Sequence, residues 1–258
     1  MAFDIDTLGG LGMDIETSST PLLTMLQKGS AEVDETHADY GSKGITGAKA
    51  GDIIYKPDGT LYKEIEILPI KNVVLYVEWK PKSAGGGLVA HHQLDVIRNP
   101  DYRPRDPKDS KSKEMLGENE LVQTSYWVVL FRHQNGEWTE GLLPFSSTGL
   151  SASRAMGKLI LAFKYPETSR FKGKPAFAFS RSYILGSEIK RNEKGSWHAF
   201  SVKPGTVLDK KEDEALLEST AAYSQKASAL LPSVGAAVKN LPAASTVDAD
   251  AEDGDSPF

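Results

Sequence analysis

Alternation of apolar and polar positions predicts β-strands through the middle of the chain. Between residues 64 and 79, isoleucines alternate with glutamates and are followed by a β-branched and aromatic run. Two further runs, 121–132 and 137–145, flank the tight-turn dipeptide Asn135-Gly136. Short strands joined by tight turns are typical of an antiparallel sheet.

A helix interrupts this series of strands. Apolar residues recur at helical spacing over residues 146–163, and two more strand-like runs follow at 176–185 and 195–203. We therefore predict a mainly β protein with an OB-fold-like, partly open Greek-key barrel, an inserted helix and a C-terminal helix. A split β-sandwich gives the same order of elements.

Composition shifts along the chain predict its organisation. Pro21 and the leucines that follow it favour a short helix, while prolines and mixed charges over residues 99–120 favour a long mobile loop. The predicted parts are a flexible N-terminal arm with a short helix (1–48), an OB-like nucleic-acid-binding domain (49–207), a helix (208–231), and a disordered linker with an acidic tail (232–258).

Charge is distributed unevenly. The 30 Lys and Arg residues against 35 Asp and Glu give a net charge of −5, yet residues 145–203 hold 11 basic and 3 acidic side chains. The last stretch, 248–258, carries five acidic and no basic side chains. A positive body with an acidic tail is typical of a protein that binds a polyanion, although ordinary surface charge can produce the same contrast.

The aromatic residues of the basic region suggest how a polyanion is bound. If residues 176–185 form a strand, Phe177, Phe179, Arg181 and Tyr183 share one face. Such a row offers rings for base stacking and a cation for phosphate. The alternative is that the rings fill the core and Arg181 reaches solvent at its edge. Further candidate DNA-binding residues are Trp197, Lys164, Arg170, Lys172, Lys174, Lys190 and Arg191.

The motifs of common enzyme classes are incomplete. No cysteine is present, and Gly85-Gly86-Gly87 lacks the Lys-Ser/Thr of a phosphate-binding loop. His91, His92 and His133 lack the spacing of zinc ligands. We therefore expect no enzymatic activity, no cofactor and no bound metal, while a magnesium-dependent nuclease stays an alternative because its carboxylate ligands need no fixed spacing.

Sequence features also suggest where the protein acts. No stretch approaches the roughly 18 apolar residues of a membrane helix, and the first residues lack the basic flank and apolar run of a signal peptide. We expect a cytoplasmic protein. The helix at 208–231 carries Leu216, Leu217 and Tyr223, which can dock on the barrel or on a second copy in a homodimer.

The final residues, DADAEDGDSPF, resemble the tip of bacterial and phage single-stranded DNA-binding proteins, which end in acidic residues and a Pro-Phe pair or a terminal Phe. Ser256 departs from the aliphatic residue that usually precedes the proline in the bacterial proteins. The order of strands and the composition of the body are also similar to phage-encoded single-stranded DNA-binding proteins with an OB-fold.

This resemblance implies a specific function and specific partners. The resemblance implies that the body binds and protects single-stranded DNA during phage-type replication, recombination or repair, in a bacterial or phage-infected cell. The resemblance also implies that the tail recruits replication or recombination proteins, for which we expect four residues to be responsible: Asp253, Asp255, Pro257 and Phe258. Besides the nuclease, the alternative is a transcription or packaging adaptor that does not contact DNA.

Overall fold

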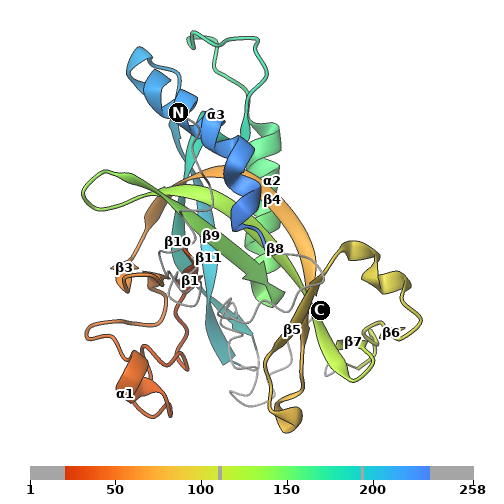
Figure 1. Cartoon of the computed structure of the whole chain (residues 1–258). Helices are drawn as coiled ribbons and strands as arrows, with labels where there is room; N and C mark the ends of the chain where they lie inside the picture. The colour runs from red at the N-terminus through yellow and green to blue at the C-terminus, as the bar shows by residue number, and fades with distance from the viewer. Residues whose placement is uncertain (1–20, 110–111, 193–194, 233–258) are drawn as a thin grey trace, which may run out of the picture.

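The computed structural model describes residues 21–109, 112–192 and 195–232, which form antiparallel sheets with two long helices (Figure 1). The larger sheet has the strand order β11-β10-β4-β8-β7-β6, with β5 paired to β4 and β9 paired to β8. Its strands are β4 (Ile65–Trp79), β5 (Leu88–His92), β6 (Tyr102–Arg103), β7 (Glu114–Leu116), β8 (Asn119–Arg132), β9 (Trp138–Ser146), β10 (Arg181–Asn192) and β11 (Gly195–Val207). The expectation of a mainly β protein is confirmed.

The remaining elements are short or helical. A small sheet consists of β1 (Leu23–Met25), β2 (Ile53–Tyr55) and β3 (Thr60–Tyr62). The α-helices are α1 (Tyr40–Lys43), α2 (Leu150–Ala162) and α3 (Glu214–Lys226). The 3₁₀ helices are η3 (Lys82–Ala84), η4 (Leu94–Arg98), η5 (Ser147–Gly149), η6 (Ala178–Ser180), η7 (Lys211–Asp213) and η8 (Ala227–Leu230).

Strand β4 organises the larger sheet because it pairs with different strands along its length. Its first residues pair with β10, its last residues pair with β5, and its other edge pairs with β8 from Ile67 to Trp79. The register with β8 shifts between Pro69 and Lys71. Pro69 has no N–H for the ladder, so a bulge at this point is expected, and a bulge bends the strand.

The largest core cluster lies between β4, β8, β9, β10 and β11, and α2 covers it. Val129, Phe131 and Tyr183 are at most 1% exposed there, and Met156 from α2 is 0% exposed. Tyr126 and Trp127 are buried, whereas Trp79 and Trp138 are half-buried against smaller clusters. The large aromatic residues of these strands therefore contribute to the core clusters.

Residues 21–27 fill the gap between the edges of β9 and β11. The Leu142 N–H donates to the Pro21 carbonyl at 2.7 Å, and the Gln27 side chain exchanges two hydrogen bonds with the backbone of His198. Within the described residues, β9 and β11 do not pair with each other, so the strands do not close into a barrel. The predicted short helix at this position is wrong: Leu23–Met25 forms β1, since burial on both faces outweighs the helix start signal.

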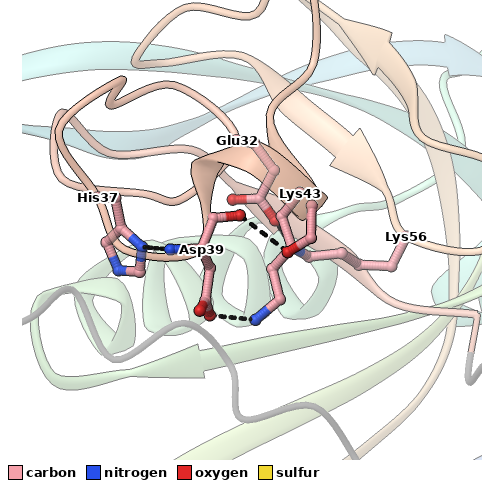
Figure 2. A network of polar contacts seen from close by, with 6 residues as sticks. Glu32, His37, Asp39, Lys43 and Lys56 are labelled. Carbon is pink, nitrogen blue, oxygen red and sulfur yellow. Dashed lines mark hydrogen bonds and ion pairs between the residues drawn. The ribbon is translucent and has the colours of Figure 1, made fainter.

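The loop that follows β1 is tied to the body by polar contacts (Figure 2). Lys56 forms an ion pair with the mostly buried Glu32, and Lys43 Nζ lies 2.7 Å from an Asp39 carboxylate oxygen. The backbone N–H of Asp39 donates to His37 Nδ1 at 3.1 Å. The Glu32–Lys56 pair therefore attaches the described part of the predicted arm to the end of β2, whereas the other two contacts lie within the loop.

The predicted C-terminal helix is present as η7, α3 and η8, and it packs on the body. Tyr223, Ala227 and Leu230 contact the outer face of the larger sheet around Tyr126 and Val128. The helix was predicted to dock either on the barrel or on a second copy of the chain. In the structure it docks on the body of its own chain. In the described part of the chain, no helix is long and apolar enough to cross a membrane.

The described part of the predicted mobile loop contains two short strands. Tyr102 pairs with Leu116 and Arg103 pairs with Met115, and β7 continues the sheet from β8 (Figure 1). The prediction missed these strands because their pairing depends on neighbouring segments and not on a local apolar pattern.

Candidate nucleic-acid interface

Cations and aromatic rings are concentrated in the connection between α2 and β10. Residues 163–181, which we call the basic-aromatic segment, form the loop at the top of Figure 1. This segment contains five basic residues and a single acidic one, Glu167. The basic residues are Lys164, Arg170, Lys172, Lys174 and Arg181, and the rings are Phe163, Tyr165, Phe171, Phe177 and Phe179. Five of the predicted lysines and arginines therefore share one segment with two of the predicted rings, Phe177 and Phe179.

Phe177 is the most exposed ring of this segment. It is 65% exposed and stacks on Phe179 with a centroid distance of 5.3 Å and an interplanar angle of 4°. Phe179 is 7% exposed and packs against Leu68 and Leu208. One face of the Phe177 ring is thus supported by a fixed ring, and the side chain is open to solvent.

A hydrogen-bonded turn fixes the position of Phe177. Its backbone N–H donates to Ser180 Oγ at 2.8 Å, and the Tyr165 hydroxyl donates to the same oxygen at 2.8 Å. A serine hydroxyl that accepts a backbone N–H three residues earlier favours a turn over a strand. The stacked pair is therefore pre-organised by its own segment.

The predicted row of four side chains on one strand face is wrong. β10 begins at Arg181, so Phe177 precedes the strand and Phe179 lies in η6. Tyr183 is 1% exposed in the main core. Of the four residues in the row, Phe177 and the half-buried Arg181 remain accessible.

The cations of the segment differ in how far carboxylates neutralise them. Arg170 lies over the Phe171 ring at 4.5 Å and 3.6 Å from a Glu214 carboxylate oxygen, and Lys172 pairs with Glu167. Three cations have no carboxylate partner in the described part of the chain, namely Lys164, Lys174 and Arg181. The segment that carries the Phe177 ring therefore also carries unneutralised positive charge.

Arg181 is the last residue of the segment and the first residue of β10. Its guanidinium lies 5.2 Å from the centroid of the Phe163 ring, and its Nε donates to the Gly205 carbonyl at 3.3 Å. A cation over an aromatic face is held in place while its remaining N–H groups can bind an anion. Arg181 can therefore contact a phosphate without leaving this position.

The other predicted DNA-binding residues lie at the far end of the β10–β11 hairpin. Lys190 pairs with Glu188 at 2.8 Å and lies opposite the half-buried Trp197, while Arg191 is exposed. Ten residues of extended strand separate Arg191 from Arg181, which is roughly 30 Å. The predicted site is thus divided into two separate regions.

A comparison with protein-family models matches residues 2–230 to the model described as Pam3 phage gp34-like protein. This chain belongs to the Pam3 phage gp34-like family. The expectation of a phage protein is therefore confirmed at the level of the family. Neither the curated proteins nor the solved structures contain a match to the chain.

In this gp34-like chain, the predicted partner-binding residues Asp253, Asp255, Pro257 and Phe258 lie outside the described residues and outside the matched range. Their role stays a prediction from the resemblance.

The histidines considered as metal ligands have other partners. His91 Nε2 lies 3.0 Å from the Tyr126 hydroxyl, His92 pairs with Glu78 at 2.6 Å, and His133 lies 2.7 Å from the Tyr62 hydroxyl. Burial, with a smaller contribution from His92, lowers the pKa of His91 to about 4. Over residues 21–109, 112–192 and 195–232, no group of three or more His, Asp or Glu side chains is arranged to hold a metal ion.

Proposed function

We propose that this chain binds single-stranded DNA through the basic-aromatic segment and protects exposed strands during phage replication or recombination. The observation that carries the proposal is the exposed Phe177 ring, which stacks on Phe179 in a segment whose Lys164, Lys174 and Arg181 have no carboxylate partner among the described residues. A base can stack on the open face of Phe177 while the phosphates contact Lys174 and Arg181.

The order of the main strands supports an OB-type architecture. Strands β10, β4, β8 and β9 lie side by side in that order, which is the 4-1-2-3 order of a Greek key. Helix α2 connects the third strand to the fourth, and β11 adds a fifth strand beside β10. We infer an OB-type barrel that is open between β9 and β11, a class of fold that binds oligonucleotides.

The position of α3 changes where DNA is expected to bind on such a fold. OB-folds usually bind ligands across their second and third strands, which correspond to β8 and β9 here. In this chain η8 and the end of α3 cover the outer face of those strands. We therefore propose that the single-stranded DNA binds to the basic-aromatic segment, where Phe177 is exposed to solvent.

Stacking on Phe177 favours a single strand over a duplex. The bases of a duplex are already stacked and paired, so an exposed ring gains a base only after local melting, which costs a few kcal/mol. Lysines and arginines attract both forms through their phosphates. A preference for the single strand therefore depends on the ring and not on the charge.

A filter-binding titration tests this function. Labelled oligo-dT and a duplex of the same length are titrated with the full chain at about 50 and 200 mM salt. Neutralisation of three phosphates predicts roughly a 20-fold loss of single-strand affinity over that range. Equal affinity for the two forms, or no binding at the lower salt concentration, would contradict the proposal; the latter result is what the adaptor alternative predicts. Degradation of the strand on addition of magnesium would favour the nuclease alternative.

We also propose that the acidic tail recruits replication or recombination proteins. A terminal phenylalanine next to carboxylates suits a hydrophobic pocket with a basic rim, and burial of the ring contributes roughly 1.5 to 3 kcal/mol. Pull-down from infected cells with the full chain and with a Phe258→Ala variant tests this. Partners retained equally by both chains would contradict a role of the terminal ring.

A further inference from the structure

A cleft of about 450 Å³ lies beside the basic-aromatic segment, between α2 and the inner face of the β4–β8 ladder. Its volume is within the range of about 300 to 1,000 Å³ typical of small-ligand sites. Ala178, the residue after Phe177, forms part of its wall. The cleft is therefore continuous with the segment that presents the stacked ring, although none of its residues belongs to the predicted DNA-binding set.

The chemistry of the cleft combines apolar surface with positive charge. Trp127 and Leu161 line it, and Leu161 is 88% exposed even though it belongs to α2. Lys71 and Arg154 are the charged residues of the lining, and no acidic side chain is among the described residues that line it. Lys71 donates to Ser228 Oγ at 2.5 Å, and neither cation has a carboxylate partner in the described part of the chain.

Side-chain amides provide hydrogen-bonding groups in the same cleft. Asn72 donates to Ser125 Oγ at 2.7 Å and to the Tyr126 carbonyl at 3.1 Å, which leaves its oxygen free to accept. Gln123 also lines the cleft. Amides of this kind bind the edges of nucleobases, which carry both donors and acceptors.

We propose that this cleft binds one nucleotide unit of the single strand. The base lies against Leu161 and Trp127, and its phosphate lies between Lys71 and Arg154. This inference rests on the proposed function, since the neighbouring nucleotide stacks on Phe177. It adds a second point of contact, on α2 and β4, beside η8, whose Ser228 accepts a hydrogen bond from Lys71.

Gly157 offers a way to block the cleft without disturbing its walls. It lies in α2 on the lining of the cleft, and a Cβ atom added to it meets no atom within 4 Å. A Gly157→Phe variant therefore fills the cleft with its own ring. The matched control is Ala155→Phe, which adds an aromatic ring at an exposed position of the same helix outside the cleft.

The test measures binding of fluorescein-labelled oligo-dT by anisotropy and binding of dTMP by tryptophan fluorescence, in the full chain. We expect Gly157→Phe to weaken oligo-dT binding about tenfold and to abolish the dTMP signal, while Ala155→Phe changes neither. Arg154→Ala, compared with Lys158→Ala on the same helix, provides a second pair if Gly157→Phe does not fold. Thermal melting followed by circular dichroism reports the fold of each variant.

The outcomes separate this inference from the proposed function. Oligo-dT binding that is lost in Phe177→Ala but unchanged in both Gly157→Phe and Arg154→Ala would overturn the inference and leave the proposed function standing. Binding of dTMP that Gly157→Phe abolishes, without any binding of oligo-dT, would overturn the proposed function and show that the cleft takes a free nucleotide.

Discussion

Phe177 is the residue on which the proposed function depends most. It is 65% exposed, yet Phe179 and the Ser180 turn hold it in place. Because a fixed ring loses little conformational freedom when a base stacks on it, the free energy of stacking is retained in the affinity.

The first prediction concerns Phe177→Ala. Loss of one stacked base corresponds to roughly 1 to 3 kcal/mol, so we expect affinity for oligo-dT to fall roughly 5- to 150-fold, as measured by anisotropy. Ile189→Ala is the matched control, because Ile189 is 57% exposed on the other end of β10. Similar losses in the two variants would contradict a specific role for Phe177.

His91 makes stability depend on pH. Its folded-state pKa of about 4 lies below the ordinary value of 6.5, so at intermediate pH the unfolded chain binds a proton that the folded chain does not. The stability that this group contributes is complete above about pH 6.5 and is lost as the pH falls toward 4.

A His91→Gln variant tests this dependence. We expect the free energy of unfolding of the wild type to fall more between pH 7 and pH 5 than that of the variant, by an amount of the order of 1 kcal/mol. Urea unfolding at the two pH values measures the difference. Parallel losses in both proteins would show that His91 does not titrate in this range.

At the scale of elements, Ser153 joins α2 to the sheet. Its Oγ accepts from Trp127 Nε1 at 2.8 Å and lies 2.7 Å from Ser125 Oγ, in a buried position. These contacts fix the distance between the helix and β8, which form two walls of the proposed nucleotide cleft.

The third prediction is that Ser153→Ala destabilises the fold. The Trp127 N–H loses its acceptor in a buried site, which costs about 1 to 3 kcal/mol. Ser151→Ala on the same helix removes an exposed hydroxyl and is expected to stay within about 0.5 kcal/mol of the wild type. Thermal melting of both variants is the measurement, and equal midpoints would contradict a structural role for Ser153.

Element types were predictable from the sequence where a long periodic pattern exists. The runs that became β4, β8 and β9 and the helix that became α2 follow the expected periods. Alternation does not define where a strand begins, however. The hydroxyl of Ser180 stabilises a turn before β10, so the four side chains predicted to share one strand face do not do so. Phe177 is exposed to solvent, whereas Tyr183 is buried in the core.

The cleft residues could not be found from the sequence in the same way. In the sequence, Lys71 and Arg154 look like ordinary surface cations. Only the packing of α2 beside β4 brings both into the lining of one cleft. Leu161 was a local signal of the cleft, because it is an apolar residue away from the buried face of α2. The helical pattern alone, however, did not show that its side chain is exposed.

At the scale of the whole molecule, the proposed function depends on the separation of charge. The body is positive between residues 145 and 203, and the five acidic residues of 248–258 oppose it. Opposite charges on one chain attract when salt is low, so the tail is expected to compete with DNA for the positive surface.

The fourth prediction is that removal of residues 248–258 tightens oligo-dT binding several-fold at about 20 mM salt and has little effect at 200 mM. A chain of full length in which the five acidic residues are replaced by their amides is the control for length and should behave like the truncation. Unchanged or weaker affinity at low salt would contradict competition by the tail.

Cross-linking locates the bound strand most directly. Oligo-dT carrying 5-iodouracil is bound to the full chain, irradiated, and the linked peptide is identified by mass spectrometry. The proposed interface predicts cross-links within residues 163–181, at Phe177 above all. Cross-links found only at the opposite end of the β10–β11 hairpin, around Lys190 and Trp197, would contradict it.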